Sequence, residues 1–419
     1  MSKIQPIRKI IPYQAHHIAS KNIPPNAISV IQHLKAAGFE AYLVGGCVRD
    51  LLVHQIPKDF DVATNALPNQ VRQLFRRCRL IGRRFRLAHV YFGREIIEVA
   101  TFRASHEGAS EDKGHTKNGV IVRDNVYGTI EEDAMRRDFT LNALYYDPIT
   151  KELLDFCDGF KDIQQQTIRI IDDAKKRYNE DPIRMLRAMR FAGKLKFHLT
   201  PDTAEPIEKS GNLLQHVPAA RLYDEILKLF HCGAATAIFP LLREYKLFKH
   251  LFPSAYKCFE QSENPVLLTE QLFKNTDKRI CDHQSLSPYF LFAAILWPAV
   301  KLEFLRLRCK NKPNMQALEQ ATRTILDEQL KSILIPKRIT AIIREIWLSQ
   351  QRLESRRPRS ITRLLTQQRF RATYDLLLLR SQTGEVPKEI ADWWTNIQSA
   401  KSAEQNRMIQ ALHQPSKSA

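Results

Sequence analysis

Two adjacent glycines directly behind a short apolar run most constrain what this chain can fold into. Residues 39–44 predict a strand, Gly45 and Gly46 predict a turn, and residues 47–52 predict a helix. Glycine has no Cβ, so the backbone N–H groups of such a turn can approach a polyphosphate closely. This order of elements predicts a mixed α/β head with a site for a phosphate-bearing ligand.

Two aspartates follow the glycine turn. Asp59 and Asp61 lie at positions i and i+2 of residues 59–63, which predict a strand, so both carboxylates are expected on one face of the sheet. Like charges held this close repel unless a cation lies between them. Such a pair alone is more often a solvated strand edge. Its place after the glycine turn predicts a divalent-metal site and nucleotidyl transfer.

A two-metal site usually needs a third acid, and the sequence offers two. Glu98 lies between the apolar Ile97 and Val99, so its side chain is expected to point towards the aspartate pair. Asp138 lies within residues 136–142, where a basic pair and an acid precede an apolar run that carries an amide. That segment could contact triphosphate and ribose hydroxyls, or Asp138 could merely cap a helix. Spacing alone leaves both acids open.

A further set of polar residues begins at a predicted helix start. Asp181 precedes Pro182, a good start for a helix, and Arg184 and Arg187 follow at three-residue spacing. On a helix surface these side chains place an acceptor beside donors. Adenine and cytosine both present an amino donor next to a ring-nitrogen acceptor, whereas guanine and uracil present the reverse order. The set could therefore select A or C without a template strand.

The charge of the chain predicts a polyanionic partner. The formal net charge is +19, of which +11 comes from residue 301 onward (22 Lys and Arg against 11 Asp and Glu). Nucleic acid is the expected partner, with an anionic membrane surface as the second choice. The seven cysteines form no Cys-x-x-Cys pair, which predicts reduced thiols in a cytoplasmic protein. Residues 289–300 are too short an apolar run to cross a bilayer and predict a core helix.

The motifs together resemble the class II template-independent nucleotidyltransferases, which include bacterial poly(A) polymerases and tRNA CCA-adding enzymes. The resemblance covers about residues 25–250 and implies that Asp59 and Asp61 bind two Mg²⁺ ions, with Asp138 or Glu98 as a further catalytic acid. It implies ATP as substrate and the following nucleotide-binding residues: Gly45, Gly46, Arg49, Arg137, Asn142, Asp181, Arg184 and Arg187.

Two arginine-rich segments favour one product of this family over the other. Residues 80–90 resemble the poly(A) polymerase form of this region, and residues 352–371 resemble the arginine-rich C-terminal region of those enzymes. An Arg-Arg-Phe-Arg run is typical of a track for RNA phosphates with a stacking ring. The residues expected to bind RNA are Arg83, Arg84, Phe85, Arg86, Arg356, Arg357, Arg359 and Arg363.

The expected architecture is an α/β nucleotidyltransferase head with a small mixed sheet, followed by an all-α neck, body and C-terminal region. The expected parts are a flexible lead, the head, a helical neck that reads the base and binds RNA, a helical body with the arginine-rich region, and a disordered tail. Their bounds are 1–25, 26–171, 172–250, 251–412 and 413–419. A polar stretch at 104–118 is expected to be a mobile loop.

The resemblance implies a cytoplasmic enzyme that adds AMP from ATP to RNA 3′ ends and releases pyrophosphate, and so promotes the processing and decay of mRNA and small RNAs. Two alternatives remain open. One is a tRNA CCA-adding enzyme, because A and C share one base pattern. The more distant alternative is a non-catalytic RNA-binding protein with a nucleotidyltransferase shell. No membrane association is expected, and any partners among RNA-decay proteins are not readable from the sequence.

Overall fold

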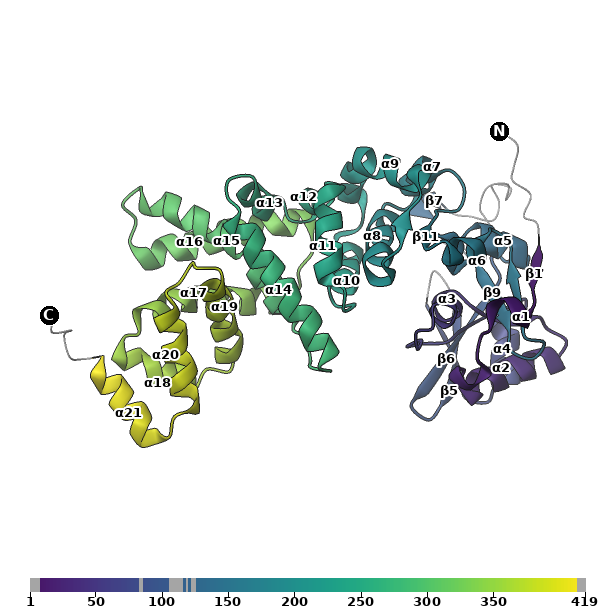
Figure 1. The fold of residues 1–419 in the computed structure, drawn as a ribbon, viewed down its shortest axis with the longest axis horizontal. Coiled ribbons are helices and arrows are strands. Elements are labelled where there is room, and N and C mark those ends of the chain that lie inside the picture. The colour runs from purple at the N-terminus through teal and green to yellow at the C-terminus, as the bar shows by residue number, and fades with distance from the viewer. Residues whose placement is uncertain (1–7, 83–85, 105–115, 118–119, 122–125, 413–419) are drawn as a thin grey trace. The chain divides into compact units, whose positions relative to one another are not determined.

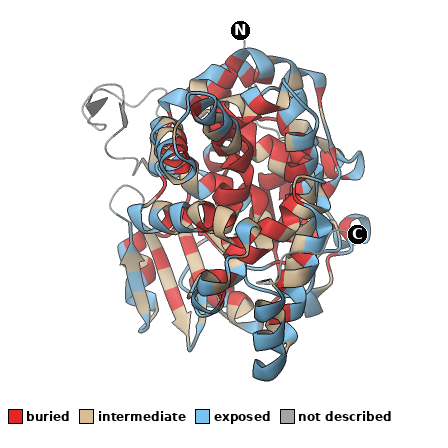
Figure 2. Cartoon of the chain, turned by 90° about the vertical axis from the view of Figure 1, so that its left-hand side faces the viewer, coloured by how far each residue is buried: buried red, intermediate tan, exposed pale blue. Residues whose placement is uncertain are grey.

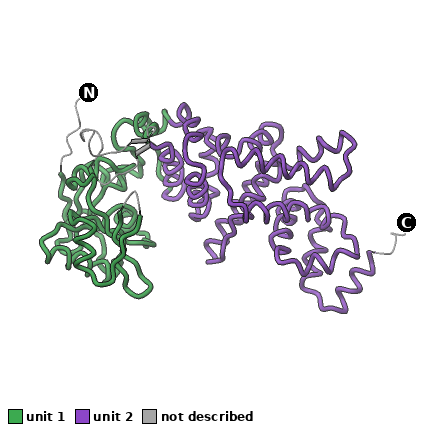
Figure 3. The backbone as a smooth tube through the Cα atoms, turned by 180° about the vertical axis from the view of Figure 1, so that it is seen from behind, with its two compact units in different colours: residues 1–180, 196–206 green, residues 181–195, 207–419 purple. Residues whose placement is uncertain are grey.

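The protein is described by a computed structural model that covers residues 8–82, 86–104, 116–117, 120–121 and 126–412 (Figure 1). It separates into two compact units (Figure 3). Unit 1 consists of residues 1–180 and 196–206, and unit 2 of residues 181–195 and 207–419. The finer domain bounds stay predictions. The expected tail and most of the expected loop at 104–118 lie outside the described residues.

The described part of unit 1 contains an eight-stranded mixed sheet, as the sequence predicts. Its order is β1-β10-β9-β2-β3-β6-β5-β4. Only β3 and β6 pair in parallel within it, and every other neighbouring pair is antiparallel. The strands are β1 (Lys9–Ile11), β2 (Ala41–Val44), β3 (Asp61–Thr64), β4 (Cys78–Ile81), β5 (Leu87–Phe92), β6 (Glu95–Thr101), β9 (Leu144–Asp147) and β10 (Glu152–Asp155).

Short helices and turns connect these strands. The expected hairpin between β5 and β6 turns at Gly93, whose φ of +64° suits glycine. Residues 8–25, expected as a loose lead, contribute β1, because the open edge of β10 offers it backbone partners. The helices of unit 1 include α1 (Tyr13–His16), α2 (Pro25–Ala36), α3 (Gly46–Leu52), α4 (Pro68–Leu74), α5 (Ile130–Met135), α6 (Gly159–Gln164) and α7 (Ala174–Glu180). Two further sheets have two strands each. One pairs β7 (Thr116–Lys117) with β8 (Val120–Ile121), and the other pairs β11 (Thr167–Ile168) with β12 (His198–Leu199).

Every regular element in the described part of unit 2 is a helix, which confirms the prediction that the α/β head is followed by an all-helical part. Residues 291–300 within α15 are buried without interruption, so the apolar run lies in a protein core. Trp347 packs there and donates its indole N–H to the carbonyl oxygen of Ala293 at 2.9 Å. Figure 2 shows buried residues gathered along the inward faces of the helices. None of the helices described in either unit is long and apolar enough to cross a membrane.

In chain order, the helices of unit 2 are α8 (Ile183–Leu195), α10 (Ala219–Phe230), α11 (Ala235–Glu244), α12 (Phe248–Leu251), α13 (Pro253–Phe259), α14 (Asn264–Cys281), α15 (Pro288–Arg308), α16 (Asn314–Ser332), α17 (Lys337–Ser355), α18 (Pro358–Leu365), α19 (Phe370–Gln382), α20 (Lys388–Ser399) and α21 (Ser402–Ala411), while α9 (Pro201–Ser210) begins in unit 1 and ends in unit 2. Several of these helices, among them α10, α11 and α17, bury one face and expose the other, as amphipathic helices do.

Candidate active site

The glycine turn links β2 to α3 and lies against two guanidinium groups. Gly45 has φ +76° and ψ −128°, a conformation that disfavours residues with a Cβ. A Cβ on Gly45 would lie 3.4 Å from Nη1 of Arg137, and one on Gly46 would lie 3.6 Å from Nη2 of Arg49. The turn therefore combines close backbone access with two positive charges, which suits a phosphate.

The expected acids lie beside this turn. Asp61 opens β3, where its Cα is paired with Val44 on one side and with Glu98 on the other. Asp59, two residues earlier, is exposed and precedes the strand. A carboxylate oxygen of Glu98 lies 3.4 Å from Nε2 of His89. The sheet register thus brings Glu98 next to Asp61, as its position between two apolar residues predicts.

The ionisation of Asp61 reflects this crowding. The pKa of Asp61 is raised to about 6, mainly by burial and further by the negative charges of Glu98 and Asp59. The positive charge of Arg137 opposes this shift. A cation would relieve the repulsion that contributes to this shift. Among the residues that the structure describes, no group of three or more His, Cys, Asp or Glu side chains is arranged to hold a metal. Mg²⁺ often takes only one or two carboxylates and completes its shell with substrate phosphates and water, so the two aspartates fit it as donors.

Asp61→Asn should therefore stabilise the protein in the absence of metal. The pKa of Asp61 is near 3.8 in the unfolded state and near 6 in the folded state, so between these pH values the folded protein keeps a proton that the unfolded chain has lost. Stability therefore falls as the pH rises from about 4 to 6, and the full cost of the ionised carboxylate is present above about pH 6. We expect a gain of about 1–3 kcal/mol in unfolding free energy at pH 7.5 with a chelator present. The gain should disappear as the pH falls towards 4. Urea unfolding across this pH range measures it, and an equal gain at all pH values would contradict the assignment.

A chain of buried hydrogen bonds joins the helix after the glycines to residues 136–142. Arg49, 5% exposed, donates from Nε and Nη2 to Oδ1 of Asp50 at 2.9 and 2.6 Å, and from Nη1 to Oδ1 of Asn142 at 2.8 Å. Asn142 in turn donates to Oδ1 of Asp138 at 3.0 Å, and the same oxygen accepts the backbone N–H of Phe139. The structure thus brings three expected site residues together and holds them rigidly.

Asp133 is a site residue that the sequence reasoning missed. It is 5% exposed, accepts from Nη2 of Arg137 at 2.9 Å and from the Tyr145 hydroxyl at 2.7 Å, and pairs with Arg136 at 3.4 Å. Burial would raise its pKa, but Arg137, the Tyr145 hydrogen bond and Arg136 outweigh this, and the pKa lies below its ordinary value. Asp133 precedes Arg136 by three residues and Arg137 by four, and side chains at this spacing lie close together on a helical turn, so the sequence did carry a signal for this contact.

The expected base-selecting residues belong to unit 2. Asp181 accepts from both Nη atoms of Arg221, at 2.9 and 2.6 Å, and from the backbone N–H of Ile183 at 3.3 Å. The contact with Ile183 confirms that Asp181 contributes at the start of α8. Arg187, within α8, places its guanidinium 5.4 Å from the ring centroid of Phe191. Arg221 was not foreseen, because it lies 40 residues further along the chain.

The expected RNA-binding residues fall in two places. Arg83, Arg84 and Phe85 lie outside the described residues, and Arg86 is exposed just before β5. Arg356 ends α17 and stacks over the ring of Trp393 at 5.8 Å. The other three arginines of that set, Arg357, Arg359 and Arg363, are exposed at the start of α18 and along it.

Three families of domains match segments of this chain. Residues 41–169 match the family described as the poly A polymerase head domain. Residues 196–258 match a probable RNA- and SrmB-binding site of polymerase A, and residues 302–419 match the polymerase A arginine-rich C-terminus.

Whole-chain relatives agree with these matches. The chain is 45% identical to poly(A) polymerase I of Salmonella typhimurium, over 97% of this chain and 90% of that protein. It is 43% identical to poly(A) polymerase I of Haemophilus influenzae, over 96% of this chain and 91% of that protein. It is 37% identical to the CCA-adding enzyme of Lactobacillus helveticus, over 48% of this chain and 49% of that enzyme.

Solved structures agree with the fold. The Thermotoga maritima CCA-adding enzyme complexed with tRNA matches with a TM-score of 0.65 at 19% identity, over 98% of this chain and 91% of that chain. An apo form of a CCA-adding enzyme matches with a TM-score of 0.67 at 18% identity, over 98% and 96% of the two chains. At this identity the likeness describes the arrangement of the helices and the sheet.

Proposed function

The chain belongs to the family of bacterial poly(A) polymerases, and from this membership we propose how it adds AMP from ATP to RNA 3′ hydroxyl groups without a template. It is a template-independent nucleotidyltransferase. The observation that carries the product assignment is the extent of similarity. The poly(A) polymerase relatives match along nearly the whole chain, including residues 302–419, whereas the CCA-adding relative matches about half of it.

Asp59 and Asp61 are proposed as the ligands of two Mg²⁺ ions. Glu98 is proposed as the third acid, because its charge acts on Asp61 across the sheet, whereas Asp138 is engaged by Asn142 and the backbone of Phe139. When bound, the ions polarise the reacting phosphoryl group and lower the pKa of the attacking hydroxyl. The carboxylates of the protein would fix the positions of the ions and so the place at which the negative charge of the phosphates is neutralised. Catalysis of phosphoryl transfer consists mostly of such positioning and charge stabilisation.

The glycine turn with Arg137 and Arg49 is proposed to bind the triphosphate. Arg137 is held by Asp133 and Tyr145, and Arg49 by Asp50 and Asn142, so neither guanidinium must be ordered when the nucleotide binds. Preordered charges of this kind stabilise a developing negative charge without a reorganisation cost. The side chains of Asn142 and Asp138 are proposed to contact the ribose of the nucleotide.

Selection of adenine is proposed for Asp181, Arg184 and Arg187. Arg221 donates one hydrogen bond to each carboxylate oxygen of Asp181, and this pair of bonds fixes the plane of the carboxylate. A planar acceptor with a neighbouring arginine complements the amino group and ring nitrogen of adenine. Because cytosine has the same pattern, this set leaves the choice between A and C to other features.

The basic residues of the chain are proposed to hold RNA mainly through its phosphates, with little sequence preference. Such an enzyme would act on mRNA and small RNAs in the cytoplasm and so promote their processing and decay.

Incubation with each NTP separately tests the product assignment. We expect long A tails from ATP on an unstructured RNA, and no extension beyond a few nucleotides from CTP, GTP or UTP, as read on a sequencing gel. A tRNA lacking its 3′ end, incubated with CTP and ATP together, serves as the second substrate. Addition that stops after C, C and A would favour the CCA-adding alternative, and the absence of any incorporation would favour the non-catalytic one.

A further inference from the structure

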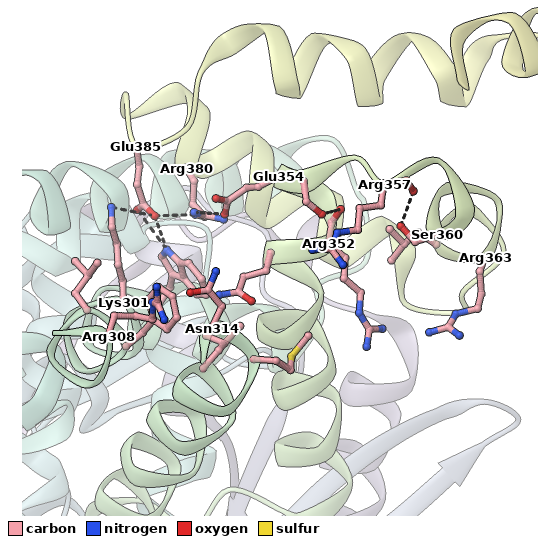
Figure 4. A pocket seen from close by; sticks show the side chains of 18 residues that line it. Lys301, Arg308, Asn314, Arg352, Glu354, Arg357, Ser360, Arg363, Arg380 and Glu385 are labelled. Atoms are coloured by element: carbon pink, nitrogen blue, oxygen red, sulfur yellow. Dashed lines mark hydrogen bonds and ion pairs between the residues drawn. The ribbon is translucent and has the colours of Figure 1, made fainter. Parts of the chain in front are cut away.

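A large cavity opens in unit 2, between α15, α16, α17 and α18 (Figure 4). Its volume is about 970 Å³. Pockets that hold ligands range from about 300 to 1,000 Å³, so this one lies at the upper end of that range and is much larger than a single ion requires. No residue of the aspartate site contributes to its lining.

The charge on the wall of this cavity is strongly positive. Six cations line it against two carboxylates, Glu354 and Glu385. Both carboxylates are occupied by one cation, Arg380, at 2.7 and 2.8 Å, and Lys301 also approaches Glu385 at 3.3 Å. The remaining cations, which are the ones left to face a ligand, are Arg308, Arg352, Arg357 and Arg363.

None of these four arginines, Arg308, Arg352, Arg357 and Arg363, has a carboxylate partner among the residues that the structure describes; Arg308 donates only to the backbone carbonyl oxygen of Lys312. Figure 4 shows Arg352 and Arg363 extending away from the ion pairs of Arg380. Uncompensated arginines around one cavity repel each other, and a ligand with several negative charges relieves that repulsion.

The back of the cavity is rigid. Arg380 is 4% exposed, lies 4.3 Å over the ring of Trp297 and bonds to Gln350 at 2.8 Å. Trp297 donates its indole N–H to Glu385 at 2.9 Å. A fully bonded polar group of this kind fixes the shape of the wall before any ligand arrives.

One side of the cavity is apolar. Phe304, Leu305, Met315 and Leu318 line it, and Leu305 is 49% exposed. A free phosphate gains nothing from contact with an apolar surface, whereas a nucleobase can stack on it because the faces of the base are apolar. The cavity therefore combines sites for phosphates with a surface for bases.

We propose that this cavity binds a short single-stranded stretch of the RNA substrate, with phosphates on Arg308, Arg352 and Arg363 and a base against Leu305. The inference rests on the proposed function and deepens it, because it adds residues of α15 and α17 to the arginines of α18. An RNA segment held here is distinct from the nucleotide at the aspartate site.

The test compares the double variant Arg308→Gln/Arg352→Gln with Arg344→Gln, an exposed arginine of α17 that does not line the cavity. Binding of a fluorescein-labelled oligoadenylate is followed by anisotropy over a range of salt concentrations. Loss of two phosphate contacts should lower the salt slope by about 1.4 and the affinity by about 25-fold at 0.1 M salt. Arg344→Gln should match the wild type.

Leu305→Ser separates the base surface from the phosphate contacts. It should weaken binding of the same oligoadenylate by about threefold, through lost apolar contact, and leave the salt slope unchanged. Thermal melting of every variant within 2 °C of the wild type shows that the fold is intact.

Two different failures can be told apart. If the wild-type protein incorporates no AMP, the proposed function is wrong. If it does incorporate AMP but the double variant binds RNA with wild-type affinity and slope, only the cavity assignment is wrong. Equal losses in the double variant and in Arg344→Gln would also overturn it, because they would reflect overall charge.

Discussion

Asp59→Asn and Asp61→Asn are each expected to abolish AMP transfer, with a loss of at least about a thousandfold in kcat, or about 4 kcal/mol of transition-state stabilisation. Asparagine keeps the size of the side chain and removes the charge. Asp61 opens β3 and Asp59 lies exposed before it, so neither change disturbs the core. Initial rates of ATP incorporation at saturating RNA and Mg²⁺ measure the loss, and oligoadenylate binding is expected to stay within about twofold.

A matched control separates this effect from a general change of charge. Asp172→Asn removes an exposed carboxylate of unit 1 that pairs only loosely, at 3.7 Å, with Lys176. Its rate should equal that of the wild type. Residual transfer above one tenth of the wild-type rate in either active-site variant would remove the metal-site assignment.

Asp133→Asn is expected to destabilise the protein by about 2–4 kcal/mol, somewhat less than the cost of unpairing a fully buried charge, because 23% of the Arg137 side chain is exposed. The buried carboxylate of Asp133 neutralises the guanidinium of Arg137, which is itself partly buried. Urea unfolding at pH 7.5 measures the change. A loss below about 1 kcal/mol would show that Arg137 finds another partner.

Tyr145→Phe is the comparison for this effect. It removes one hydrogen bond to Asp133 and one from Arg137 but leaves the ion pair in place. The expected cost is about 1–2 kcal/mol. Because the pKa of Asp133 is held low in the folded state, its contribution is fully present at neutral pH and is lost only as the pH falls below its unfolded value near 3.8. The difference in stability between Asp133→Asn and the wild type should therefore shrink in acid.

Local patterns in the sequence anticipated most of the fold. The glycine turn, the strand that carries Asp61 and the helix after Gly46 are set by residues within a few positions of each other. Glu98 was expected near Asp61 because a residue between two apolar neighbours in a strand must face the other side, and the register places it there. The helical character of the C-terminal half followed from its period of hydrophobic residues.

Contacts between distant segments were not readable in this way. The grip of Arg221 on Asp181 joins residues 40 positions apart, and the bond from Arg49 to Asn142 joins residues 93 positions apart. Many polar residues in the chain could form such pairs equally well by composition. The choice among them depends on which surfaces the packed helices and strands bring together.

The sequence by itself determined the order of elements, the face of β6 from which Glu98 projects and the basic character of the C-terminal region, because each is encoded in near neighbours. Only the tertiary structure decided that Asp133 neutralises Arg137, and that arginines from α15, α17 and α18 share one cavity. The physical reason is that a buried charge selects its partner by proximity in the packed core, and proximity between distant segments exists only after the chain has folded.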